Sequence, residues 1–274
     1  MFRHARTGLI FNLVALALPA LLWAGFQDKD LASNERFLGQ LVNVERGHQG
    51  LPTLTYDEML ADLARAQSRD MLLRHFFSHA NPDGEGPSER ALRLHPELVA
   101  RIGENLHHVM ITPGYELSEN MSLDQITQNA IAALMKSPPH RANILSPDYD
   151  HIGAGYAASE DEVLITQTFA EEICLLDSAP PKDMLRDGTL FLTGRLFASF
   201  PPNRFAVFLK VPDPKATYSL EKGKETVGGR FLDVEVKPDL RFRVMVSLDA
   251  GPGEYQVMMG REERLIPGPV IMVR

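Results

Sequence analysis

Two histidines and one glutamate in this chain of 274 residues could together do chemistry: His79, Glu104 and His140. Two neutral imidazoles and a carboxylate offer a first-row divalent cation, most readily Zn²⁺, three ligands and an open position for water. Without a metal, the same groups form a proton-transfer set, in which the carboxylate raises the pKa of a nearby histidine. The three positions lie too far apart for one helical face, so only the tertiary fold can bring them together.

Each of these residues also has a purely structural interpretation. His79 could hydrogen-bond the turn predicted at Asn81–Gly84, and His140 could fill the space that follows two prolines. Glu104 could accept backbone N–H groups, because its neighbours Gly103 and Asn105 suggest a tight bend. The residues alone leave these alternatives open.

The element that would position His140 is a helix ended by two prolines. Ser122 and Gln125 have the spacing of a capping box, which predicts a helix over Leu123–Lys136. Pro138 and Pro139 end that helix, because proline lacks an N–H and restricts the residue before it. His140 is therefore expected just past a rigid break.

Periodic apolar residues predict the other elements of the first part of the chain. A capping box from Thr55 to Glu58 is expected to start the longest of the helices. The predicted helices are Asn34–Arg46, Tyr56–Arg74 and Pro87–Leu94, and the predicted strands are Ile152–Ala157 and Val163–Phe169.

Five short motifs occur in a characteristic order. They are His75–His79 with the following Asn81–Gly84, Gly103–Leu106, Ser137–Leu145, Ile152–Gly155 and Thr166–Phe169. This set resembles the CAP superfamily, also called SCP/TAPS, which includes cysteine-rich secretory, antigen 5 and pathogenesis-related proteins. The resemblance covers about Phe37–Glu172 and is strongest to the compact, cysteine-poor bacterial branch.

The resemblance implies a three-layer α-β-α sandwich, the CAP domain, over residues 31–178. It also implies a central cleft with two histidines and two glutamates, in which His79, Glu104 and His140 take three places. The chain departs from the family at the fourth place, where Ser137 replaces a glutamate and Leu134 replaces a tryptophan. The expected cleft residues are thus His79, Glu104, His140 and Ser137, with the first three as ligands of a weakly bound Zn²⁺.

The first 26 residues have the composition of an export signal. Arg3, His4 and Arg6 precede the apolar run Leu9–Ala24, which predicts either a cleaved signal peptide or an uncleaved N-terminal membrane anchor. In both cases the folded part is expected outside the cytoplasm, as a secreted, periplasmic or membrane-anchored protein. Contact with a membrane is expected only through this segment.

Composition excludes several classes of function. The net charge of −8, with the excess of acidic residues before residue 184, argues against a nucleic-acid partner. The single cysteine, Cys174, excludes an intrachain disulfide and is expected to be a small buried apolar residue. Neither a G-x-S-x-G nucleophile elbow nor an H-E-x-x-H zinc motif occurs.

The pattern changes after the linker Ala179–Lys182. Short alternating apolar runs separated by Pro, Gly, Asp and Asn predict an all-β sandwich of immunoglobulin-like type over residues 184–274. The expected fold class is therefore α+β, with a CAP domain followed by this accessory domain.

Three functions agree with these expectations. The first is an exported binding protein, without catalysis, whose His/Glu cleft takes a divalent metal or a small or cell-envelope ligand. The second is an extracytoplasmic metal-dependent hydrolase acting on envelope material or peptides. The third is a structural envelope protein with a vestigial cleft. The ligand could be a lipid, a glycan or a protein, and whether the chain is an enzyme stays open.

Overall fold

The computed structural model describes residues 28–111, 121–185, 188–219 and 225–274. The expected export segment, residues 1–26, lies outside these ranges. No helix within them is both long enough and apolar enough to cross a membrane.

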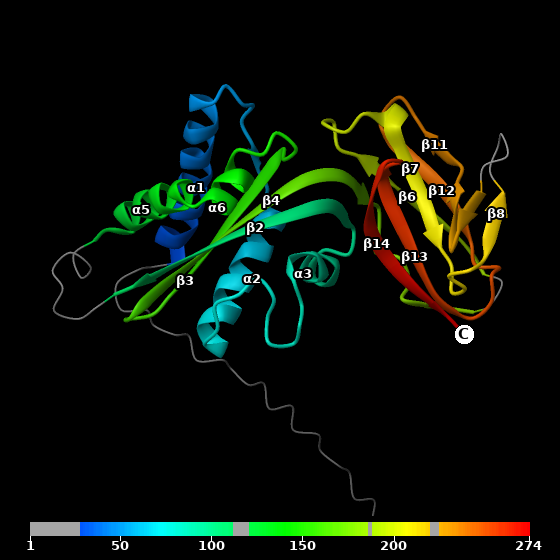
Figure 1. Ribbon diagram of the computed structural model, residues 1–274, viewed down its shortest axis with the longest axis horizontal. Helices are drawn as coiled ribbons and strands as arrows, with labels where there is room; N and C mark the ends of the chain where they lie inside the picture. Colours follow the sequence, from blue (N-terminus) through cyan, green and yellow to red (C-terminus); the bar gives the residue numbers. More distant parts are fainter. Residues whose placement is uncertain (1–27, 112–120, 186–187, 220–224) are drawn as a thin grey trace, which may run out of the picture.

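The first part of the chain forms three layers, with helices on both faces of a twisted sheet (Figure 1). One face carries α1 (Asp28–His48), α5 (Leu123–Lys136) and α6 (Pro138–Ile144), and the other carries α2 (Glu58–Arg74) and α3 (Pro87–Leu94). The strands between them are β1 (Thr55–Tyr56), β2 (Leu98–Met110), β3 (His151–Ala158) and β4 (Glu162–Leu176).

Strand β4 is the centre of this sheet. It pairs antiparallel with β3 along one edge and with β2 along the other, and β1 adds to β3 in parallel. Separate apolar clusters fill the two sides of the sheet. The α1/α5 side includes Leu38, Val42, Ile126, Leu134, Ile152 and Phe169, and the α2/α3 side includes Leu60, Leu63, Ala91, Leu98 and Ala170.

Two glycines of β3 allow α2 to lie directly on the sheet. A Cβ atom at Gly153 would lie 2.1 Å from the backbone nitrogen of Ala61, and one at Gly155 would lie 2.1 Å from that of Arg65. Alternate residues of a strand point to opposite faces, so the intervening side chains of β3 face α1 and α5. The Ile152–Gly155 motif is therefore a packing motif.

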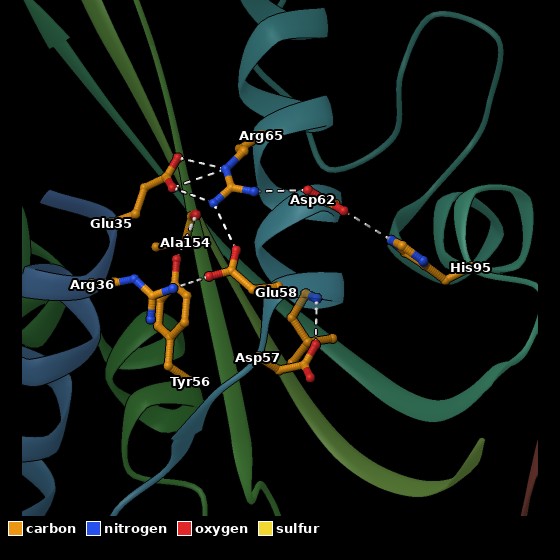
Figure 2. Close-up of polar contacts among 10 residues, drawn as sticks. Glu35, Arg36, Tyr56, Asp57, Glu58, Asp62, Arg65, His95 and Ala154 are labelled. Carbon is orange, nitrogen blue, oxygen red and sulfur yellow. Dashed lines mark hydrogen bonds and ion pairs between the residues drawn. The ribbon is translucent and has the colours of Figure 1, made fainter. Parts of the chain in front are cut away.

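An ion-pair network with a buried Glu35 links α1 to α2 (Figure 2). Arg65 of α2 donates from Nη2 to Glu35 Oε2 of α1 at 2.7 Å, and the Glu35 side chain is almost fully buried. The same guanidinium also binds Glu58 at 3.1 Å and Asp62 at 2.8 Å. Because the Arg65 guanidinium of α2 also binds Glu35 of α1, the network holds the two helices together.

The predicted helix bounds agree best where a cap determines them. The structure has α3 and α5 at the expected residues, and the Ser122–Gln125 capping box forms with both of its hydrogen bonds. The prediction of a Thr55–Glu58 capping box is wrong. Thr55 pairs with His151 in β1, and the side chain of Asp57 caps α2 by accepting from the Leu60 nitrogen at 3.0 Å.

Strand β2 replaces the tight bend considered at Gly103–Asn105. These residues lie in the middle of the strand and pair with Phe169, Thr168 and Gln167 of β4. Gly103 is needed for a different reason. A Cβ atom there would lie 2.1 Å from the Tyr149 hydroxyl, so only glycine lets this ring cross the strand.

The second part of the chain is all-β, as predicted, and its immunoglobulin-like type stays a prediction. Two sheets pack on one apolar cluster, and a short hairpin pairs β8 with β9. Strands β6 (Thr189–Leu196), β12 (Arg241–Ser247) and β11 (Val234–Val236) extend the sheet of the first part. The second sheet has the order β10 (Gly229–Leu232), β7 (Phe205–Lys210), β13 (Gly253–Arg261), β14 (Arg264–Val273), β5 (Asp183–Met184), and the hairpin strands are β8 (Thr217–Ser219) and β9 (Glu225–Val227).

The last residues of β4 join the two parts. Residues 174–176 pair with β6, and Ile173, Cys174 and Leu176 belong to the apolar cluster of the second part. The Cys174 thiol is fully buried, and its Sγ lies 3.7 Å from Met259 Sδ. This confirms the expectation of a buried, apolar cysteine. Burial also raises the pKa of the thiol, so it is a poor nucleophile.

Candidate functional site

Glu104 lies in the centre of the sheet, where a charge needs partners. It occupies the middle of β2, opposite Thr168, and its side chain is 2% exposed. An ionised carboxylate removed from water is stable only if it is paired and hydrogen-bonded. The residues that provide this pairing therefore define the site.

The first partner of Glu104 is a buried arginine from α3. Arg90 Nη2 donates to Glu104 Oε2 at 2.8 Å, and the Arg90 side chain is also 2% exposed. Helix α3 begins with Pro87 at its first turn and places Arg90 one turn further, where its side chain reaches inward to the sheet. The two opposite charges form an internal pair that is closed to solvent.

The second partner is His79. Its Nδ1 lies 2.9 Å from Glu104 Oε1, while its side chain is 54% exposed. An ionised carboxylate only accepts hydrogen bonds, so Nδ1 carries the proton and donates it. This leaves Nε2 as the ring nitrogen that can contact an outside partner. The hydrogen bond to Glu104 raises the pKa of His79 above its usual value, although partial burial and the charge of Arg90 oppose this effect.

The turn after His79 holds the histidine in place. Gln67 Nε2 of α2 donates to the carbonyl oxygen of Ser78 at 2.6 Å. Asn81 Oδ1 accepts from the backbone nitrogens of Asp83 and Glu85, at 3.0 and 2.9 Å. The expected Asn81–Gly84 turn is present, with the Gly84 nitrogen donating to the Asn81 oxygen at 2.8 Å.

His140 is brought to the same strand by two asparagines. Pro138 and Pro139 end α5 as expected, but they also begin α6, so His140 lies in the first turn of a new helix. Asn105 Nδ2 donates to the backbone oxygen of His140 at 3.0 Å, and Asn143 Nδ2 donates to that of Glu104 at 3.1 Å. A third bond joins Asn143 Nδ2 to Asn105 Oδ1 at 2.9 Å.

His79 acts electrostatically on His140. Partial burial lowers the pKa of His140, and the charge of His79 lowers it further. The ring of His140 has no hydrogen bond or ion pair with any residue that the structure describes. The structure therefore joins His79 and Glu104 directly and places His140 near them, with a lowered pKa.

Ser137 connects α5 to α6 through its backbone. Its nitrogen donates to Leu134 O at 3.1 Å, and its oxygen accepts from the Arg141 nitrogen at 2.9 Å. The Ser137 side chain makes no capping hydrogen bond to α6. A role of this hydroxyl in ligand binding stays a prediction.

The described donors do not fit a divalent cation. No group of three or more His, Cys, Asp or Glu side chains in the described ranges is placed to hold a metal ion. Both oxygens of Glu104 already accept a hydrogen bond, from Arg90 and from His79, so a metal ion would have to share this carboxylate with the buried cation of Arg90. Two imidazoles remain, fewer than the three protein ligands of a catalytic zinc site.

A cavity of about 610 Å³ lies beside the buried pair, between α2, the turn after His79 and α3. Arg90 belongs both to this cavity and to the pair with Glu104, and Gln67 lines the cavity from α2. A second cavity, of about 470 Å³, lies between α5 and α6 and is lined by Pro138, Arg141 and Leu145.

Sequence reasoning missed the main partner of Glu104. Arg90 lies in a short helix rich in charged residues, and a single arginine there is expected to be solvent-exposed. Asn105 and Asn143 stood beside expected site residues, but their role of joining α6 to β2 depends on contacts 35 to 39 positions apart. Only the Ser-Pro-Pro break at residues 137–139 signalled that a new element begins at this point.

The family comparison agrees with this fold and these residues. A model of the cysteine-rich secretory protein family, CAP, matches residues 40–169. That range contains His79, Arg90, Glu104, Ser137 and His140. Over residues 40–169 the chain therefore carries a CAP domain.

Two Bacillus subtilis (strain 168) proteins are similar to the chain over this domain. "Uncharacterized protein YkwD" is 33% identical over 129 residues, which cover 47% of this chain and 44% of that protein. "Uncharacterized membrane protein YlbC" is 27% identical over 137 residues, covering 50% and 34%. The chain thus spans less than half the length of these relatives.

Among solved structures, an extracellular protein with an SCP domain from Bacillus anthracis is similar at a TM-score of 0.42 and 23% identity. The match covers 53% of this chain and 44% of that one. An outer surface protein from Borrelia burgdorferi matches at a TM-score of 0.41 and 16% identity, covering 53% and 94%.

Proposed function

We propose that the chain is an exported CAP-domain protein that binds a small or cell-envelope ligand through His79, without catalysing a reaction on it. One observation carries this proposal. Glu104, deep in the sheet, holds the half-exposed ring of His79 through Nδ1 and leaves Nε2 for an outside partner. A ring fixed at one nitrogen binds a ligand without first losing its own rotational freedom.

Binding is favoured over hydrolysis by the chemistry of the groups present. A nucleophilic enzyme needs a hydroxyl or thiol within hydrogen-bond reach of its base. No described hydroxyl or thiol hydrogen-bonds to His79 or His140, and Cys174 is buried at the junction with the second part. A metal-dependent hydrolase would use Glu104 as a ligand or as a general base, and both oxygens of this carboxylate already accept hydrogen bonds.

The location of the protein is part of the same proposal. The apolar run after Arg3 and Arg6 supports export, and one relative carries the word membrane in its name. We place the CAP domain and the β-sandwich outside the cytoplasm, with the second part as an accessory domain of immunoglobulin-like type.

The test is a comparison of two single-histidine variants of the full chain. His79→Ala removes the proposed contact, and His48→Ala is the matched control, because His48 is 64% exposed at the end of α1. Binding to a washed cell-envelope fraction is measured by co-sedimentation. We expect His79→Ala to bind at least about tenfold more weakly, the loss that one good charge-assisted hydrogen bond gives. His48→Ala should bind like the unmodified protein. Equal binding by the His79→Ala variant would exclude this site.

A further inference from the structure

We propose that Arg90 determines what the His79 site accepts. Its guanidinium acts as the internal counter-ion of Glu104 and thereby keeps divalent cations out. The site is left to uncharged or anionic ligands that hydrogen-bond to the histidine. This inference rests on the proposed function, because it names the class of ligand that the same site takes.

The geometry of the Arg90–Glu104 pair supports a role of Arg90 as a permanent counter-ion of this carboxylate. Both side chains are 2% exposed, and Nη2 of Arg90 lies 2.8 Å from Oε2 of Glu104. A guanidinium stays charged at every pH that a folded protein tolerates. The other oxygen of this carboxylate, Oε1, accepts a hydrogen bond from Nδ1 of His79.

Arg90 cannot move aside for a metal ion at low cost. Its Nε and Nη1 are buried and have no hydrogen-bond partner among the described residues. Within the described part of the chain, Glu104 is therefore the one acceptor of this guanidinium, and rotation away from it would leave a whole buried charge unpaired. A metal ion entering beside Arg90 would also meet a positive charge within the same small volume.

The charge balance points to the class of ligand. The positive charge of Arg90 and the negative charge of Glu104 cancel, so the site has no excess negative charge to attract a cation. Nε2 of His79 accepts a hydrogen bond while the ring is neutral and donates one once the ring is protonated. A hydroxyl or an amide, which can donate and accept, therefore meets the exposed edge of His79 in either state, and a carboxylate meets the protonated ring, without displacing either buried group.

Removal of Arg90 should turn the site into a metal site. In Arg90→Met, a side chain of similar length fills the space without charge, and Glu104 becomes a buried carboxylate with one oxygen unpaired. A divalent cation can then take the place of the guanidinium, with His79 and Glu104 as ligands. We expect Zn²⁺ affinity to rise at least about tenfold, the size of effect that groups contacting metal ligands commonly have.

The experiment titrates the full chain with Zn²⁺ alone by calorimetry, and with Co²⁺ to follow its visible absorption. Arg90→Met should bind zinc more tightly than the unmodified protein. Arg90→Lys, which keeps a cation, and Arg90→Met/Glu104→Gln, which removes the carboxylate, should not. If folded Arg90→Met gains no zinc affinity, or if the double variant gains as much, the assignment to Arg90 is wrong.

The unmodified protein provides a check that needs no stable Arg90 variant. If it binds one Zn²⁺ tightly and His79→Ala abolishes that binding, the proposal fails. Failure of the proposed function gives a different result, namely equal envelope binding by the His79→Ala and His48→Ala variants. Zinc binding gained only on removal of Arg90 supports the role of Arg90 in either case.

Discussion

Two buried glutamates lie on neighbouring strands of one sheet and have opposite surroundings. Glu104 of β2 and Glu172 of β4 have side chains that are 2% and 0% exposed. Glu104 has a hydrogen bond to each oxygen, one of them from an arginine. Neither oxygen of Glu172 has a hydrogen-bond partner among the described residues, although His151 Nδ1 lies 3.3 Å from Oε2.

The surroundings of Glu172 favour its neutral form. Burial raises its pKa to about 8, and the nearby Asp57 and Asp150 add to this effect, while His151 opposes it. The second part of the chain closes the cluster, with the Phe197 ring 5.6 Å from that of His151. His151, the first residue of β3, is thus largely buried at the junction, with its side chain 15% exposed.

The state of a buried carboxylate therefore depends on its partners as much as on its burial. A fixed cation pairs with one oxygen of Glu104, and the other oxygen orients His79, as a recognition site requires. Without such a cation, Glu172 holds a proton near neutral pH and makes the junction between the two parts sensitive to pH. Three sets of variants test this contrast.

The largest effect is expected on breaking the buried pair. Arg90→Ala leaves Glu104 uncompensated and should lower the free energy of unfolding by about 3–5 kcal/mol. Urea unfolding followed by circular dichroism measures this change. The double variant Arg90→Ala/Glu104→Ala should lose less than the sum of the two single variants, because it leaves no unpaired charge. Arg69→Ala, at an exposed position of α2, is the control and should cost less than about 0.5 kcal/mol. An additive double variant would show that the pair is not coupled.

Glu172→Gln should act through pH. The folded-state pKa of about 8 lies above the ordinary value of 4.5, so the folded protein holds this proton more tightly than the unfolded chain. The stability from this proton is complete below pH 4.5 and is lost as the pH rises through about 8. Burial lowers the pKa of His151, but the hydrogen bond to Asp150 and the nearby carboxylates outweigh burial and raise it, so the contribution of His151 is lost in the same direction.

The Gln variant, which cannot lose a proton, should therefore show a flatter stability curve between about pH 5 and 8.5. At the upper end it should be more stable than the unmodified protein by about 1–3 kcal/mol. Unfolding free energies at several pH values measure this. Glu160→Gln, in an exposed turn, is the matched control. Parallel curves for the Glu172→Gln variant and the unmodified protein would mean that Glu172 is charged throughout.

The contrast between the two glutamates also marks what the sequence could predict. Capping residues and apolar spacing are local, so α3 and α5 were predicted at their observed bounds. The convergence of His79 and Glu104 was expected only through the family resemblance. The partners that decide the state of each carboxylate are not local. Arg90 comes from a helix whose charged residues suggest exposure, and Phe197 comes from the second part of the chain.

Tertiary contacts overrode local signals in β1 and β2 for the same reason. Thr55 has the spacing of a cap, but its backbone pairs with β3 instead. Gly103 suggests a turn, but it lies in a strand because Tyr149 needs the space of its missing side chain. Both errors concern residues whose conformation depends on a segment about 45 or 95 positions away.

The smallest effect separates the two partners of Glu104. His79→Ala should cost less than about 1 kcal/mol of stability, because the ring is 54% exposed and solvent screens its charge. The pKa of His79 is raised by its hydrogen bond to Glu104, so its contribution is complete below the unfolded value of 6.5 and is lost as the pH rises through the folded value. The variant should therefore differ from the unmodified protein at about pH 5.5 and match it at about pH 9, by urea unfolding. A loss as large as that of Arg90→Ala, and equal at both pH values, would mean that His79 supports the fold. Glu104 would then be a structural residue, as Glu172 is, and its contact with His79 would not support a recognition site.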